Sequence, residues 1–176
     1  MINIPLANPS RELEHIPNFE KKLNEQFRGG VYVGGESVDN FENNFKDIIR
    51  AKYCVSLNSG TDALILALIA LGIKKGDRVL VPSFTFFSTV ECILHLNAIP
   101  VFVDINLKNY TIDLDDFISK ATSKIKAAIP VHLFGNDAQI TEIKKICLEK
   151  NIKLVEDVAQ AFGSQDEKNN YLGSIG

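Results

Sequence analysis

A carboxylate and an amide follow a mainly apolar run close to the end of the chain. Residues 152–155 have the composition of a buried strand, Asp157 lies just beyond them, and Gln160 comes three residues later. Open α/β folds bind their ligands at the carboxyl ends of such strands. The pattern therefore predicts a ligand site that contains this acid and this amide. Glu156 is expected on the opposite side of the strand, where it caps the next helix or faces solvent.

Neighbouring acids also bind magnesium, so Glu156 and Asp157 form an alternative metal site. Only Asp104 adds another carboxylate at the end of a comparable predicted strand, and a metal site leaves Gln160 without a role. We therefore favour an organic ligand and expect no metal.

A second candidate site lies where a predicted strand turns through a glycine into a predicted helix, in the segment Asn58 to Leu64. The free N–H groups and the dipole at a helix N-terminus favour a phosphate group. Gly60 lets an anion approach closely, and the Thr61 hydroxyl can add a hydrogen bond. The alternative is an ordinary cap formed by Asn58 or Ser59, and the segment by itself favours that alternative. It matches neither the dinucleotide fingerprint nor the Walker loop.

Aromatic side chains follow another predicted strand, at 78–81, and are expected at the same edge of the sheet. They are Phe84, Phe86 and Phe87. Such a side chain can stack on a flat heterocycle, although packing in the core is the commoner fate of phenylalanine. His132 also lies at a predicted strand end, and a substrate-pocket role and a structural role fit its position equally well.

From about residue 50 onward, strand-like and helix-like segments alternate. This alternation indicates βαβ units and a mostly parallel sheet with helices on both faces. Most of the strands are continuously apolar, which is typical of strands that are covered on both sides. The predicted strands are 53–57, 78–81, 99–105, 127–133 and 152–155, and the predicted helices are 61–71, 88–97, 114–121 and 138–150.

The first part of the chain has a different pattern. Two amphipathic helices are expected at 16–27 and 38–49, joined by the glycine-rich loop 29–35. We expect residues 1–50 to form a helical arm that packs on the main sheet or on a partner subunit. Residues 51–176 are expected to form the α/β domain.

The composition of the 176-residue chain is that of a globular domain, with 45% apolar and 23% charged residues. A net charge of −3 without a basic cluster argues against nucleic acid as a partner. Cys54, Cys92 and Cys147 are dispersed, which indicates reduced thiols in a cytoplasmic protein. No signal peptide is visible at the start of the chain, and the longest apolar stretch, 63–71, is too short to span a membrane.

Taken together and in order, these segments resemble those of a known family. The matching segments are S-G-T-x-A-L at 59–64, P-S-x-T-F-x-A-T at 82–89, P-V-H-L-x-G at 130–135 and E-D-x-A-Q-A-x-G at 156–163. This set is similar to that of the DegT/DnrJ/EryC1/StrS family of sugar aminotransferases, which use pyridoxal phosphate (PLP). The resemblance runs from Ile4 and Pro5 to residues 173–176, and Ser88 stands where the family often has alanine.

The resemblance assigns roles to the candidate residues. It implies that Gly60 and Thr61 hold the phosphate of PLP and that Phe86 lies over the pyridine ring. It also implies that Asp157 pairs with the ring nitrogen and that Gln160 lies against the ring hydroxyl. A carboxylate at the ring nitrogen keeps that nitrogen protonated, so that the ring serves as an electron sink.

The resemblance further implies the large domain of the aspartate-aminotransferase-like fold, PLP fold type I, and a homodimer with active sites at the subunit interface. The implied reaction transfers an amino group from glutamate to a nucleotide-linked keto sugar. Two alternatives stay open. One is a PLP-dependent sugar dehydratase of the same family, in which histidine replaces the cofactor lysine, and the other is a non-catalytic protein that binds PLP or a nucleotide sugar.

In the family, the G-S-x-G segment, here 173–176, is followed by a phosphate-binding serine and then by the lysine that carries the cofactor. Neither falls within the 176 residues, and Lys168 precedes the segment. We therefore expect the chain to be an N-terminal part of the enzyme, incomplete at its carboxyl end and inactive by itself.

Overall fold

The computed structural model describes residue 5 and residues 8–176. The chain divides into two compact units, one up to Phe41 and one from Glu42 to Gly176. The division therefore falls inside a helix and not at the expected boundary after residue 50. Side-chain contacts give the physical reason, because the Glu42 carboxylate accepts hydrogen bonds from the N–H and hydroxyl of Ser56, at 2.7 and 2.8 Å.

The first unit is helical, as predicted. Its elements are α1 (Pro9–Leu13), α2 (Phe19–Gly29) and the beginning of α3 (Glu36–Ile49). Gly30 caps the C-terminus of helix α2 with a φ of 71°, which glycine adopts readily. Ile4, the first residue of the family resemblance, lies outside the described residues.

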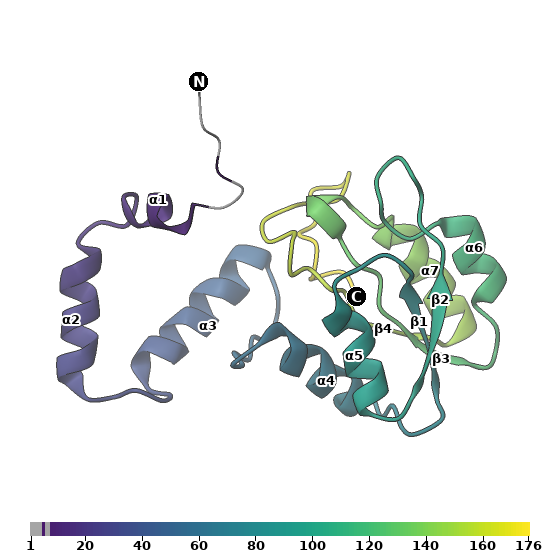
Figure 1. Ribbon diagram of the computed structural model, residues 1–176, viewed down its shortest axis with the longest axis horizontal. Coiled ribbons are helices and arrows are strands. Elements are labelled where there is room, and N and C mark those ends of the chain that lie inside the picture. The colour runs from purple at the N-terminus through teal and green to yellow at the C-terminus, as the bar shows by residue number, and fades with distance from the viewer. Residues whose placement is uncertain (1–4, 6–7) are drawn as a thin grey trace. The chain divides into compact units, whose positions relative to one another are not determined.

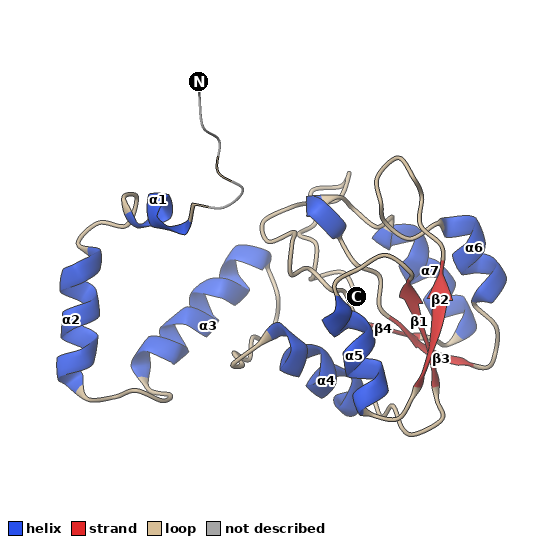
Figure 2. Cartoon of the chain, in the orientation of Figure 1, coloured by secondary structure: helices blue, strands red, loops and turns tan. Residues whose placement is uncertain are grey.

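The second unit is built on a four-stranded sheet in which all paired strands are parallel (Figures 1 and 2). The strand order is β2-β1-β3-β4. The strands are β1 (Arg78–Pro82), β2 (Ile99–Val103), β3 (Ile125–Ala128) and β4 (Lys153–Leu154). The predicted parallel α/β architecture is confirmed.

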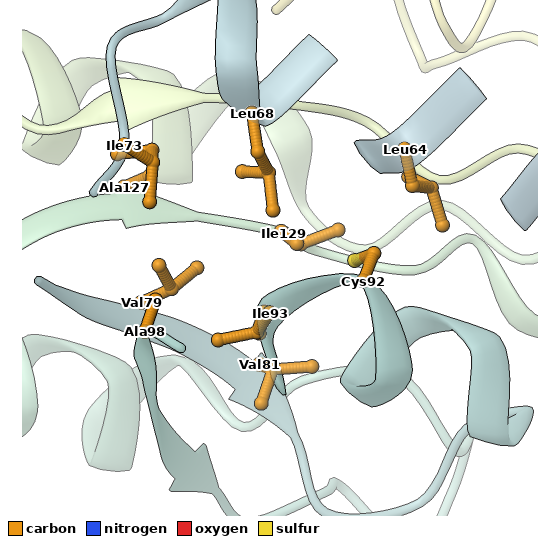
Figure 3. Close-up of a cluster of buried hydrophobic side chains, with 10 residues drawn as sticks. All are labelled: Leu64, Leu68, Ile73, Val79, Val81, Cys92, Ile93, Ala98, Ala127 and Ile129. Atoms are coloured by element: carbon orange, nitrogen blue, oxygen red, sulfur yellow. The ribbon is translucent and has the colours of Figure 1, made fainter. Parts of the chain in front are cut away.

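Helices alternate with these strands along the chain and cover both faces of the sheet. They are α4 (Gly60–Ala70), α5 (Phe87–His95), α6 (Leu114–Lys120) and α7 (Ile140–Lys150), with a short 3₁₀ helix at Leu133–Gly135. Helices α4 and α5 pack on one face, in a cluster that contains Leu68 and Ile93 (Figure 3). Helices α6 and α7 pack on the other, in a cluster that contains Phe117 and Ile143.

Strand β1 explains how one short strand supports two cores. Val79 and Val81 belong to the cluster of α4 and α5, whereas Leu80 belongs to the cluster of α6 and α7. All three side chains are fully buried. Burying each of them stabilises the fold by about 1.5–3 kcal/mol, so the continuous apolar run fixes a strand covered on both sides.

The predicted strand at 53–57 is wrong. Tyr53 and Val55 are 75% and 77% exposed, and no described segment pairs with this stretch in a ladder. A strand needs a neighbour for its backbone N–H and C=O groups, and β-rich composition alone does not supply one. Strand β3 also ends earlier than predicted, although an isolated parallel bridge joins Val131 to Asp157 further along.

Candidate functional site

A cavity of about 200 Å³ lies at the carboxyl ends of the strands of the second unit. Five of the six predicted site residues line it together, and these are Gly60, Thr61, Phe86, Asp157 and Gln160. The sixth, His132, is not among the lining residues. Segments that are about 100 residues apart in the chain thus meet at one place, as the sheet-edge argument predicted.

The start of α4 forms one wall of the cavity. Ser59 is the cap, because its hydroxyl oxygen accepts the N–H of Asp62 at 3.1 Å, so the capping alternative is confirmed. Capping does not exclude an anion here, since Gly60 and Thr61 line the cavity one and two residues further on. The Thr61 hydroxyl donates to the hydroxyl of Ser88 at 2.8 Å, which links the starts of α4 and α5.

Asp157 is nearly buried and is held from several directions. Its backbone N–H donates to Pro130 and its carbonyl accepts from His132, both at 3.0 Å. Its Oδ2 accepts the hydroxyl of Thr89 at 2.9 Å, and its Oδ1 accepts the N–H of Ala159 at 3.2 Å. The carboxylate therefore has a fixed orientation at the cavity wall.

Thr89 is a site residue that the sequence reasoning missed. It is buried, lines the cavity and donates to Asp157 from the first turn of α5. Its position at the end of the P-S-x-T-F-x-A-T segment was visible, but its partner lies 68 residues away. Only the packing of α5 against the sheet brings the two together.

Phe86 is exposed, and the core-packing alternative for the three phenylalanines is wrong. Phe84, Phe86 and Phe87 are 50%, 71% and 63% exposed. Gln160 is exposed as well, and its Oε1 accepts the N–H of Phe134 at 3.0 Å. Phe134 has a φ of 56°, an uncommon value for a bulky residue, so this hydrogen bond holds a strained backbone.

His132 and Glu156 form a separate buried pair behind the cavity wall. His132 is fully buried, its Nδ1 accepts the N–H of Ala138 at 3.2 Å, and its Nε2 lies 3.1 Å from Glu156 Oε2. The ring is therefore the neutral tautomer that donates from Nε2. Of the two roles considered for His132, these contacts support the structural one.

The expectation that Glu156 caps a helix or faces solvent is wrong. Its side chain is only 2% exposed, and its oxygens accept the N–H groups of Gly173, Ile175 and Gly176 in addition to His132. Burial opposes the charge, but these hydrogen bonds outweigh it and hold the pKa of Glu156 below its ordinary value. The segment 173–176 folds back onto the strand end and buries this carboxylate.

The thiol of Cys92 lies in the core beside the site. Burial, together with the charge of Asp157, raises the pKa of Cys92 to about 12, so the group stays a neutral thiol. Within the described residues, no group of three or more histidine, cysteine, aspartate or glutamate side chains is placed to hold a metal ion. No helix in the described part of the chain is long and apolar enough to cross a membrane.

Comparison with protein families gives a match over almost the whole chain. The model of the DegT/DnrJ/EryC1/StrS aminotransferase family matches residues 14–176. The GDP-perosamine synthase of Escherichia coli O157:H7 is 37% identical to this chain over 175 residues. That alignment covers 98% of this chain and 46% of the synthase, so the chain spans less than half the length of this relative.

Solved structures of related enzymes have the same fold. The structure of S. venezuelae DesV with a ketimine intermediate matches with a TM-score of 0.87 at 30% identity, over 91% of this chain and 43% of DesV. The E. coli GDP-4-keto-6-deoxy-D-mannose-3-dehydratase with bound hydrated PLP matches with a TM-score of 0.87 at 28% identity, over 96% of this chain and 44% of the dehydratase. The fold is thus that of PLP-dependent aminotransferases.

Proposed function

Because the chain belongs to the DegT/DnrJ/EryC1/StrS aminotransferase family, we propose that it forms the PLP-binding part of an enzyme that aminates a nucleotide-linked keto sugar. One observation carries this proposal. A helix start that favours an anion, an exposed aromatic ring and an oriented carboxylate line a single cavity, at Thr61, Phe86 and Asp157. These are the groups that a phosphorylated pyridine requires.

The lining residues fit PLP in their chemistry. The first-turn N–H groups at Gly60 and Thr61 would bind its phosphate, since N–H groups and the helix dipole both favour negative charge there. Asp157 would accept the proton of the ring nitrogen in a charge-assisted hydrogen bond. Phe86 would cover one face of the ring and exclude water, and the amide of Gln160 would contact the ring hydroxyl.

Bound PLP supplies a ring that withdraws electrons from the substrate carbon next to its nitrogen. The contribution of Asp157 is to keep a proton on the ring nitrogen, because a carboxylate stabilises the cationic ring and a neutral amide does not. Thr89 and the N–H of Ala159 hold that carboxylate in place, so it does not have to reorient when the ring binds.

Family membership and the names of the relatives support the proposed substrates. GDP-perosamine synthase and dTDP-3-amino-3,6-dideoxy-alpha-D-galactopyranose transaminase, which are both 37% identical to this chain, are named for sugars linked to a nucleotide. We propose a keto sugar of this type as amino acceptor and glutamate as amino donor. We also propose a cytoplasmic homodimer, and the three free cysteines are consistent with a reducing compartment.

A sugar dehydratase of the same family is the second candidate. The observation that favours it is structural, because the dehydratase and DesV match this chain with the same TM-score of 0.87. The cavity residues described here serve both reactions equally. The two candidates differ in product, since transamination leaves nitrogen on the sugar and dehydration removes a hydroxyl group from it.

The test uses the intact protein that contains these residues, supplied with PLP, glutamate and nucleotide-linked 3-keto and 4-keto sugars. We expect 2-oxoglutarate and an amino sugar in equal amounts. A deoxy sugar without retained nitrogen would instead establish the dehydratase. No described residue that lines the cavity is a lysine, so residues 1–176 alone should bind PLP without transaminating. Failure of the intact protein to bind PLP would overturn the proposal.

A further inference from the structure

We infer that, of the hydroxyl side chains that line this cavity, Ser88 is the one that donates to the phosphate, and that Thr61 acts by orienting Ser88. This inference rests on the proposed function, because it concerns the anion at the start of α4. Ser88 lies in the first turn of α5 and lines the same cavity as Thr61. The family resemblance assigns the phosphate to Gly60 and Thr61 and gives Ser88 no role.

The hydroxyl protons at the cavity distinguish Ser88 from the other hydroxyl side chains there. Four hydroxyl side chains line the cavity, namely Thr61, Thr85, Ser88 and Thr89. Each hydroxyl carries one proton and can donate it to one acceptor at a time. The residue that serves an anion must therefore be one whose proton is not already given to another protein group.

Three of the four protons are engaged. Thr89 donates to Asp157 at 2.9 Å. The Oγ1 atoms of Thr85 and Thr89 are 3.0 Å apart. Because Thr89 already donates its proton to Asp157, Thr85 is the donor in this contact. Thr61 donates to Ser88 at 2.8 Å. Of these four hydroxyl groups, that of Ser88 is the one whose proton has no protein acceptor within the described residues.

The surroundings of Ser88 favour an anion. Its oxygen accepts from Thr61, which polarises its own O–H bond and makes it a better donor. Helix α5 has no side-chain cap, since Phe86 stands at the cap position and offers no acceptor. The positive end of the helix dipole therefore remains available beside this hydroxyl. The carboxylate of Asp62, in the first turn of α4, accepts from Ser59 and does not line the cavity.

The experiment measures the dissociation constants of PLP and of pyridoxal, which lacks the phosphate, by calorimetry on the intact protein. Ser88→Ala should weaken PLP binding about tenfold, the cost of losing a hydrogen bond to a charged group, and should leave pyridoxal binding unchanged. Ser88→Thr keeps the hydroxyl and should restore most of the affinity. Ser83→Ala is the matched control, because Ser83 lies in the loop that precedes α5, is exposed and does not line the cavity.

Thr61→Val separates the two hydroxyls, because it removes only the group that orients Ser88. We expect a loss of about threefold, smaller than that of Ser88→Ala. The inference is overturned if Ser88→Ala binds PLP like the wild type, or if Thr61→Val has the larger effect. A wild-type protein that binds no PLP overturns the proposed function as well, whereas a PLP-binding wild type with an unaffected Ser88→Ala variant overturns this inference alone.

Discussion

The two acids at the end of β4 are neighbours in sequence but differ in how much of their hydrogen-bonding capacity the protein uses. A carboxylate offers about four acceptor positions. Glu156 receives four donors, from His132 and from three backbone N–H groups of the segment 173–176. Asp157 receives only two from the described residues, one from Thr89 and one from Ala159. A carboxylate whose acceptor positions are all used by protein donors stabilises the fold. A carboxylate that keeps free acceptor positions at the wall of a cavity is available to a ligand.

The largest effect is expected from Asp157→Asn, on activity. Asparagine has the same shape but cannot stabilise a proton on a ring nitrogen, so kcat should fall about 100-fold to 1000-fold. The free energy of unfolding should change little, because the part of the chain that the structure describes supplies only two donors to this carboxylate. Steady-state kinetics with glutamate and the keto sugar, together with urea unfolding, measure both quantities.

The matched control for this substitution is Asp115→Asn, on the exposed side of α6. It removes the same charge outside the cavity and should leave kcat unchanged. Near-wild-type turnover by Asp157→Asn would remove the distinction between the two acids, because Asp157 would then have no chemical role.

The next effect is expected from Glu156→Gln, on stability. The NH₂ group of glutamine would face N–H donors that now point at a carboxylate oxygen, which leaves buried donors unsatisfied. We expect a loss of about 2–3 kcal/mol in the free energy of unfolding. Urea unfolding of the 176-residue chain measures it, and Glu149→Gln, at an exposed position of α7, is the control. A loss no larger than that of the control would contradict the structural role.

Features that depend on residues close together in the sequence could be predicted, whereas contacts between residues far apart in the sequence could not. The parallel sheet and the cavity residues Gly60, Thr61 and Asp157 follow from local patterns, since apolar runs and strand ends are readable along the chain. The donors to Glu156 lie 17–24 residues from it, and Thr89 lies 68 residues from Asp157, so packing alone brings them together. The predicted strand 53–57 failed for the same reason, because strand formation depends on a neighbour.

A smaller effect is expected at acid pH. Hydrogen bonds hold the folded-state pKa of Glu156 below its ordinary value of 4.5. Its contribution is therefore fully present above about pH 4.5 and is lost as the pH falls through the folded-state pKa. The stability difference between wild type and Glu156→Gln should thus shrink between pH 7 and pH 3, as measured by urea unfolding at each pH. A difference that is constant with pH would show that the charge of Glu156 does not contribute.

The smallest effect is expected from Thr89→Val, which removes one of the two donors to Asp157 and preserves the shape of the side chain. Losing one hydrogen bond to a carboxylate that keeps its other partner should cost about 1 kcal/mol, which corresponds to about a fivefold fall in kcat. Thr89→Ser retains the hydroxyl and should keep most of the activity. Because Thr89 acts through Asp157, its effect should vanish in the Asp157→Asn background. A full additional loss in the double variant would mean that Thr89 acts on the ligand directly, and that the carboxylate is oriented by its backbone alone.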